Sequence, residues 1–115
     1  GNAHYHPGMA KAWGLVTVAA GTPALTAGYN ITSVTDGGPG IISPQFTTAM
    51  SSANYAVIAT ITHATPGSLR VLEVINTARL TTGFTVTVLE EGNTAGSSPN
   101  AIDNVSFSFA VYGDI

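Results

Sequence analysis

Short stretches rich in β-branched and aromatic residues follow one another along most of this chain, and turn sequences such as DGGPG, ATPGS and GNTAGSSPN separate them. Such stretches are typical of β-strands, because branched and aromatic side chains fit a pleated, half-buried surface, whereas glycine and proline mark turns. We expect strands at residues 10–20, 27–35, 40–48, 54–63, 68–76, 83–91 and 104–113, and at most one helical turn, at residues 48–54. The spacing is typical of a sandwich or a small barrel, and we predict an all-β fold, a small antiparallel β-sandwich of about seven strands.

Alternation within these strands predicts which side chains enter the core, because successive side chains on a strand point to opposite faces of the sheet. Two strands have one clearly apolar face, formed by Phe84, Val86 and Val88 in the first and by Phe107, Phe109 and Val111 in the second. Two others are apolar on both faces: Ile58 lies opposite Tyr55, Val57, Ala59 and Ile61, while Leu72 and Val74 lie opposite Leu69, Val71 and Ile75. Strands of this kind need cover on both faces, so we expect a second subunit to supply it.

Charge is scarce in this chain. Charged residues make up 8% of it and hydrophobic residues 44%, whereas about a quarter of the residues of an ordinary soluble domain are charged. A lone domain needs charge on its surface to stay soluble, so this composition also favours a homo-oligomer.

Several classes of partner and site are disfavoured by composition. Lys11, Arg70 and Arg79 are the only basic residues apart from histidine, too few for a nucleic-acid partner. The absence of cysteine excludes disulfides and thiolate metal sites. Every apolar run is shorter than the roughly 18 residues that cross a bilayer, so we expect a soluble protein without membrane insertion. A start at Gly1 with no leader sequence suggests a piece of a longer chain, in which residues 1–9 precede a β-domain at residues 10–115.

No catalytic constellation is visible in the sequence. The acidic residues are scattered, and the adjacent Glu90 and Glu91 would point to opposite faces of a strand, so they do not form an acid–base pair. Neither a nucleophile motif nor a phosphate-binding loop occurs. We expect a protein that is not an enzyme.

Five segments together resemble a known family. They are AKAWG at residues 10–14, YNITSVTDGGPG at 29–40, FTTAMSSANYAVIAT at 46–60, LRVLEV at 69–74 and FAVYGD at 109–114. In this order they resemble the C-terminal domain common in tail fibres of tailed bacteriophages. Residues 64–104 follow that family only loosely, and GLVTVAAGTPAL replaces its usual polar first turn.

The resemblance implies a β-sandwich protomer in a parallel homotrimer at the tip of a virion tail fibre, with residues 1–9 as the end of the preceding fibre shaft. It also implies binding to the surface of a bacterial host, through a polysaccharide or an outer-membrane protein. Because the family varies in residues 64–104, the resemblance does not carry a particular ligand to this chain.

Two histidines near the N-terminus, His4 and His6, form a weak motif for a metal site. In an extended segment they project to one side, so three copies around a threefold axis would offer six imidazoles to one transition-metal ion such as iron, zinc or nickel. Trimeric fibres of the family use His-x-His in this way. The alternative is an ordinary terminus with solvated histidines, and we expect the fold itself to need no cofactor.

Two other ring-bearing side chains have structural and functional interpretations. Trp13, the single tryptophan, is either a sugar-stacking platform or, as we favour, a core or interface anchor beside Leu15. His63 continues the face of Tyr55 and is expected to be a hydrogen-bonded rim residue rather than a catalytic base.

The longest expected loop is a candidate for glycan binding. It contains short polar side chains that can form hydrogen bonds with sugar hydroxyls: Asn93, Ser97, Ser98, Asn100, Asp103 and Asn104. The same residue types form turns in loops without a ligand, so both interpretations stay open.

Three functions are therefore considered. The first is a fibre tip that binds a bacterial surface glycan without hydrolysing it. The second is a purely structural trimerisation cap or virion decoration without a ligand, and the third is a lectin-like or cytokine-like trimer of cellular origin. Specific binding to a glycan would distinguish the first from the second.

Overall fold

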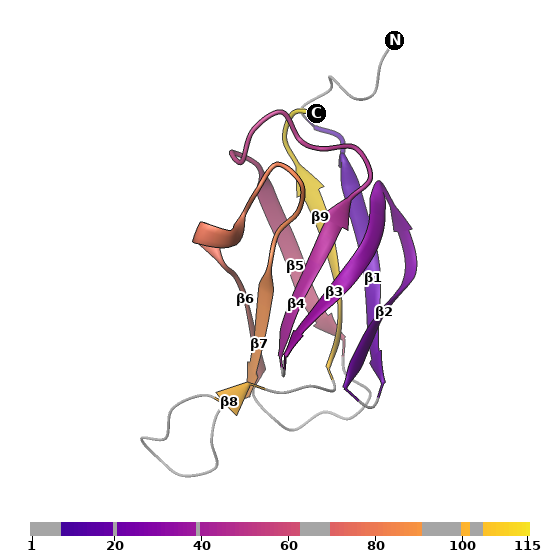
Figure 1. The fold of residues 1–115 in the computed structure, drawn as a ribbon, viewed down its shortest axis with the longest axis vertical. Coiled ribbons are helices and arrows are strands. Elements are labelled where there is room, and N and C mark those ends of the chain that lie inside the picture. The colour runs from indigo at the N-terminus through magenta and orange to yellow at the C-terminus, as the bar shows by residue number, and fades with distance from the viewer. Residues whose placement is uncertain (1–7, 20, 39, 63–69, 91–99, 102–104) are drawn as a thin grey trace.

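The structure is a computed structural model that describes residues 8–19, 21–38, 40–62, 70–90, 100–101 and 105–115. This part of the chain is all-β (Figure 1). Its strands are β1 Ala12–Ala19, β2 Thr22–Tyr29, β3 Ile31–Gly38, β4 Ile41–Phe46, β5 Ala56–Thr62, β6 Arg70–Val74, β7 Val86–Glu90, β8 Asn100–Ala101 and β9 Ser106–Tyr112. One 3-10 turn, η2 Asn76–Ala78, follows β6.

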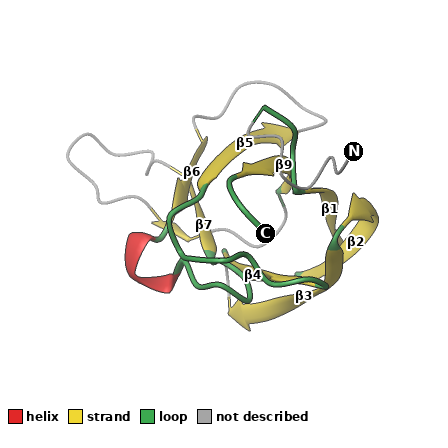
Figure 2. Ribbon diagram, turned by 90° about the horizontal axis from the view of Figure 1, so that it is seen from above, coloured by secondary structure: helices red, strands yellow, loops and turns green. Residues whose placement is uncertain are grey.

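The strands form two antiparallel sheets. One has the order β2-β1-β9-β5, and we call it the β1 sheet. The other has the order β3-β4-β7-β6, with the short β8 also paired to β7, and we call it the β7 sheet. Seen along the strands, the two sheets face each other around a common interior (Figure 2). The predicted all-β, sandwich-like fold with antiparallel sheets is therefore confirmed for one chain.

The prediction of one strand at residues 27–35 is wrong, because the chain leaves the β1 sheet and enters the β7 sheet in the middle of that run. Asn30 has a φ of 57°, in the left-handed region that asparagine tolerates, and it separates β2 from β3. Residues 21–26 lay between two predicted strands, so most of β2 was not predicted. Pro23 fits there because β2 is an edge strand, where half of the backbone amides have no partner strand.

The helical turn expected at residues 48–54 is also absent, and those residues form bends. The helical turn of the described chain lies instead at η2, where the strand predicted at residues 68–76 has already ended. The segment at 48–54 is held by contacts with other loops, described below, rather than by bonds along its own backbone.

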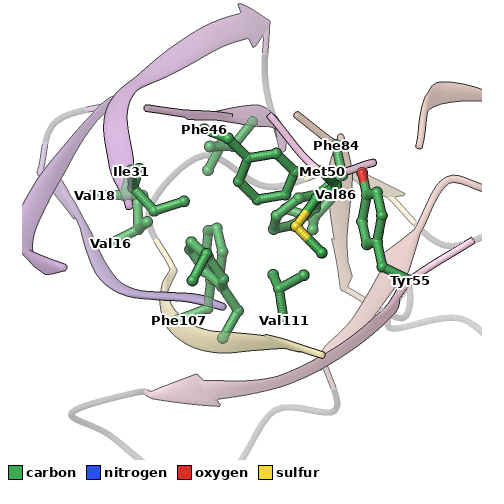
Figure 3. Close-up of a cluster of buried hydrophobic side chains, with 13 residues drawn as sticks. Val16, Val18, Ile31, Phe46, Met50, Tyr55, Phe84, Val86, Phe107 and Val111 are labelled. Carbon is green, nitrogen blue, oxygen red and sulfur yellow. The ribbon is translucent and has the colours of Figure 1, made fainter. Parts of the chain in front are cut away.

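The core lies between the sheets and contains the apolar faces predicted by alternation. Its buried side chains include Phe84, Val86, Val88, Phe107, Phe109 and Val111. Aromatic rings meet at its centre, where Phe84 and Phe109 make an edge-to-face contact with centroids 5.1 Å apart. Figure 3 shows this cluster, with the Met50 and Tyr55 side chains entering it beside Val111.

Trp13 is not a core residue, contrary to one of the two structural roles considered for it. Its side chain is 44% exposed, and its neighbours Ala12 and Gly14 point inward instead. The reason is the partner strand: Gly14 pairs with Phe109, and a Cβ at Gly14 would lie 2.8 Å from the Phe109 ring. The Phe109 ring occupies the space on the inner face of β1, so the larger Trp13 side chain lies on the outer face of the sheet.

Candidate interaction surface

Most of the residues predicted to bind a ligand lie outside the described residues. This holds for His4 and His6, and for Asn93, Ser97, Ser98, Asp103 and Asn104. His63, expected to be a hydrogen-bonded rim residue, also lies outside the described residues. Asn100 is described only as backbone in β8, where it pairs with Glu90 of β7. The described part of the chain holds no group of three or more His, Cys, Asp or Glu side chains that could bind a metal ion. Nor does it contain a helix that could span a membrane.

The two ends of the sandwich are built differently. Figure 1 shows the start of β1 and the C-terminal residue Ile115 at one end of the molecule. At the opposite end lie the ends of β1, β3, β5 and β7 and the starts of β2, β4, β6 and β9. The connections at residues 63–69 and 91–104 therefore leave and re-enter the described chain at the end opposite the termini.

The end that carries the termini is held by hydrogen bonds between segments far apart in sequence. The Asn30 side chain accepts from the Thr48 amide at 2.7 Å and donates to the Thr48 carbonyl at 3.1 Å. The Ser51 amide donates to the carbonyl of Asp114 at 2.8 Å. These residues belong to three of the segments that carry the family resemblance, so those segments stabilise the same end of the fold.

Tyr55 and Arg79 complete this end. The Tyr55 hydroxyl points to the carbonyl oxygens of Leu80 and Gly83, at 2.7 and 2.9 Å. The Arg79 guanidinium lies 5.8 Å from the centre of the Tyr55 ring, and its Nε donates to the carbonyl of Ala53 at 2.9 Å. Burial raises the pKa of Tyr55 from 10.0 to about 12, against the lowering effects of Arg79 and the Leu80 hydrogen bond. This buried tyrosine is therefore a neutral hydrogen-bond donor at physiological pH.

The outer face of the β1 sheet is a large surface without charge. None of the residues in β1, β2, β5 or β9 is acidic or basic. Lys11, directly before β1, is only 2% exposed, and its ammonium donates to the carbonyl of Met9. In contrast, strands of the β7 sheet carry Asp36, Arg70, Glu73 and Glu90. We call the outer face of the β1 sheet the uncharged face.

Strand register places the three exposed large apolar residues of the uncharged face in one row. Across β2, β1, β9 and β5 this row consists of Tyr29, Trp13, Ala110 and Ile58. The next row consists of Ala27, Leu15, Ser108 and Thr60. Exposed fractions are 46% for Tyr29, 44% for Trp13 and 65% for Ile58, so the row projects from the sheet.

A shallow hollow of about 250 Å³ lies on the same face, over β5 and β9. It is lined by Ile58, Ala59, Thr60, Ser108, Phe109 and Ala110. Small side chains, Ala110 and Ser108, stand beside the larger Trp13 and Leu15 of the neighbouring strand, and this difference in size leaves the depression. The uncharged face thus offers a projecting aromatic side chain and a hollow lined by methyl and hydroxyl groups.

Parts of this surface, but not the whole of it, could be predicted from the sequence. Ile58 was predicted as an apolar residue opposite the Tyr55 face of its strand, and the structure confirms that it is exposed. The row was not predicted, because a row across four strands depends on register between segments far apart in the chain. The available signal was that residues 12–19, 22–29, 56–62 and 106–112 contain no Asp, Glu, Lys or Arg.

Comparisons with known proteins found nothing similar to this chain. A scan against protein-family models gave no match, and neither did searches of curated proteins and of solved structures. What the structure defines is a class: an all-β protein of two antiparallel sheets with one uncharged outer face.

Proposed function

We propose that this chain is the distal domain of a bacteriophage tail fibre, a homotrimer at the tip of the virion that binds a receptor on the bacterial surface. The receptor is a surface polysaccharide or an outer-membrane protein, bound without hydrolysis. The proposal begins from the family resemblance of residues 10–114 and is supported by the different construction of the two ends of the molecule.

The observation that carries it is that hydrogen bonds between resembling segments gather at one end of the molecule, whereas the long divergent connections join strands at the other end. Asn30, Thr48, Tyr55 and Asp114 belong to resembling segments, and all take part in hydrogen bonds at the end that bears the termini. The divergent connections at residues 63–69 and 91–104 join strands at the opposite end (Figure 1). A fibre domain needs this arrangement: a constant end that continues the fibre and a variable end that meets the host.

Receptor binding is tested with the purified protein on an array of bacterial surface polysaccharides, together with a panel of outer-membrane proteins. We expect specific binding to one of them. Replacing Asn93, Asn100 and Asp103 together by alanine should weaken it by about tenfold or more, since each removes a hydrogen-bonding group. Thr32→Ala with Ser33→Ala is the matched control, because both residues are exposed on β3 and should leave binding unchanged.

A structural cap without a ligand is the second candidate function. The uncharged face favours it, since that face is suited to packing within an assembly and requires no receptor. A stable trimer that binds nothing on either panel would select the cap and overturn receptor binding. A specific polysaccharide ligand whose binding is unaffected by the triple alanine variant would keep the fibre tip but move its site away from residues 93–103.

A further inference from the structure

We infer that the uncharged face is the surface through which copies of this chain pack together, with Trp13 of one copy seated in the β5–β9 hollow of the next. This inference rests on the proposed homotrimer, because it names the surface that forms it. It concerns the sides of the protomers and is independent of any receptor site at their ends.

Charge selects a second copy as the occupant of this face. The centres of stable interfaces are depleted of charged residues, and here four complete strands lack them. A partner that is charged at the point of contact would find no opposite charge on the face and would lose its own hydration. A copy of the same face brings methyl, hydroxyl and aromatic groups, the same kinds that it meets, and leaves no charge buried.

Shape gives copies of this face complementary parts. The projecting side chain, Trp13, lies on β1, whereas the hollow lies over β5 and β9. These two positions allow a reciprocal pair, in which each Trp13 enters the hollow of the other copy, or a ring, in which each Trp13 enters the hollow of the next copy. The ring needs at least three copies, so the proposed trimer selects the ring over the pair.

The residue types agree with this packing. Tryptophan is enriched among the residues that dominate binding energy at interfaces, where it fills pockets in the partner. Four of the six lining residues, Ala59, Thr60, Ser108 and Ala110, have small side chains, which leaves room for an indole ring beside Ile58. Ile58, at 65% exposure, is the most exposed of the large apolar residues described and borders the hollow.

The test compares Ile58→Lys with Val71→Lys. Both replace an exposed apolar side chain on a strand, but Ile58 lies on the uncharged face and Val71 lies on β6 of the other sheet. Light scattering over a dilution series should show a trimer for the unmodified chain and for Val71→Lys. Ile58→Lys should fall to monomers, or associate about a hundredfold more weakly, because it buries an unpaired charge. Far-ultraviolet circular dichroism should show all three folded.

Trp13 supplies a second readout, because it is the only tryptophan. In the trimer its emission should be blue-shifted and protected from acrylamide, and in Ile58→Lys the emission should shift to the red and the protection should be lost. Trimers that survive Ile58→Lys would overturn this inference and leave the proposed homotrimer intact, formed through another surface. A monomeric unmodified chain would overturn both.

Two other occupants of the face give different results. If residues 1–7 of the same chain covered Trp13, deleting them would expose the indole without changing the mass of the particle. If a receptor glycan bound there, adding the polysaccharide identified on the array would shift the Trp13 emission. Either result would overturn the inference.

Discussion

At the scale of single residues, Tyr55 connects the core to two loops. Its ring packs in the core against Phe46, and its hydroxyl reaches the carbonyl oxygens of the turn at Leu80 and Gly83. Only the protonated phenol can donate to those oxygens. The hydrogen bonds therefore tie the loop after β4 to the turn before β7, and they depend on the protonation of one group.

Because these hydrogen bonds need the protonated phenol, we expect the folded state to lose stability at high pH. The unfolded chain releases the tyrosine proton near pH 10, whereas the folded chain holds the Tyr55 proton until about pH 12. Stability from the neutral phenol is therefore complete below pH 10 and declines as the pH rises toward 12, by up to about 2–3 kcal/mol. Urea unfolding from pH 8 to pH 12 measures it. Tyr55→Phe should be about 1 kcal/mol less stable at pH 8, with a flatter decline; an equally steep decline would assign the alkaline loss to other groups.

The sequence alone could not predict which side chains of β1 face the core, as Trp13 and Gly14 show. From the sequence, Trp13 was interpreted as a core or interface anchor beside Leu15, because indole rings mostly serve packing. In the structure Ala12 and Gly14 point inward, and Trp13 lies on the outer face of β1. The inward set was decided by Phe109, which pairs with Gly14 from a strand nearly the whole chain away and fills the interior there.

At the scale of elements, the junction between β2 and β3 decides the topology. The chain passes from the β1 sheet to the β7 sheet at a single residue, Asn30, with φ at 57°. The same residue holds the loop after β4 through its side chain, and its carbonyl accepts from the Thr47 amide at 3.1 Å. One asparagine thus sets the direction of the turn and fixes the neighbouring segment.

Substitutions at Asn30 should separate these two roles. Asn30→Gly keeps the left-handed backbone but removes both side-chain hydrogen bonds, so we expect a loss of about 1 kcal/mol. Asn30→Ala also places a Cβ in the left-handed region and should cost about 1 kcal/mol more. Denaturant unfolding of the three proteins gives the order. Equal stability of the glycine and alanine variants would show that the junction relaxes to another conformation.

Local pattern predicted the elements well where both ends of a strand were marked by turns. The strands containing Val86 and Phe109 were placed correctly with their inward faces, because polar and apolar residues alternate there without interruption. The run at 27–35 failed because its residues all favour strands, and the change of sheet depends on one backbone angle at Asn30. Sheet order was beyond prediction, since β1 pairs with β9 at the far end of the chain.

At the scale of the whole molecule, the metal proposal for His4 and His6 becomes testable. These residues lie outside the described part of the chain, so donor chemistry alone supports the site. If three chains share one ion, elemental analysis should find about one metal per three chains. His4→Ala with His6→Ala should release it while the sandwich stays folded, and occupancy should fall below about pH 6.5, where imidazole binds a proton. Purified trimers that contain no metal would leave an ordinary terminus.

Charged residues are distributed unevenly between the two sheets of the molecule. Charged residues of the described chain lie in strands of the β7 sheet, near the termini or, for Arg79, in the connection from β6 to β7, whereas the strands of the β1 sheet have none. Tyr29, Trp13 and Ile58 are exposed on this face, and exposed apolar patches of this kind mark interaction sites. If the uncharged face is covered by other copies, part of what stabilises each sandwich comes from its neighbours.

Unfolding and dissociation should then occur together. The midpoint of thermal unfolding should rise with protein concentration, because dilution favours the separated chains. Heating should convert trimers directly to unfolded chains, and a detergent gel of an unheated sample should retain the trimer band, since an interface this apolar resembles a core cut in half. Ile58→Lys should lose the concentration dependence and melt as a monomer at a lower temperature, while Val71→Lys should melt like the unmodified chain. Folded monomers released well below the unfolding temperature would mean that the interface is small, and that each sandwich is stable by virtue of its own core.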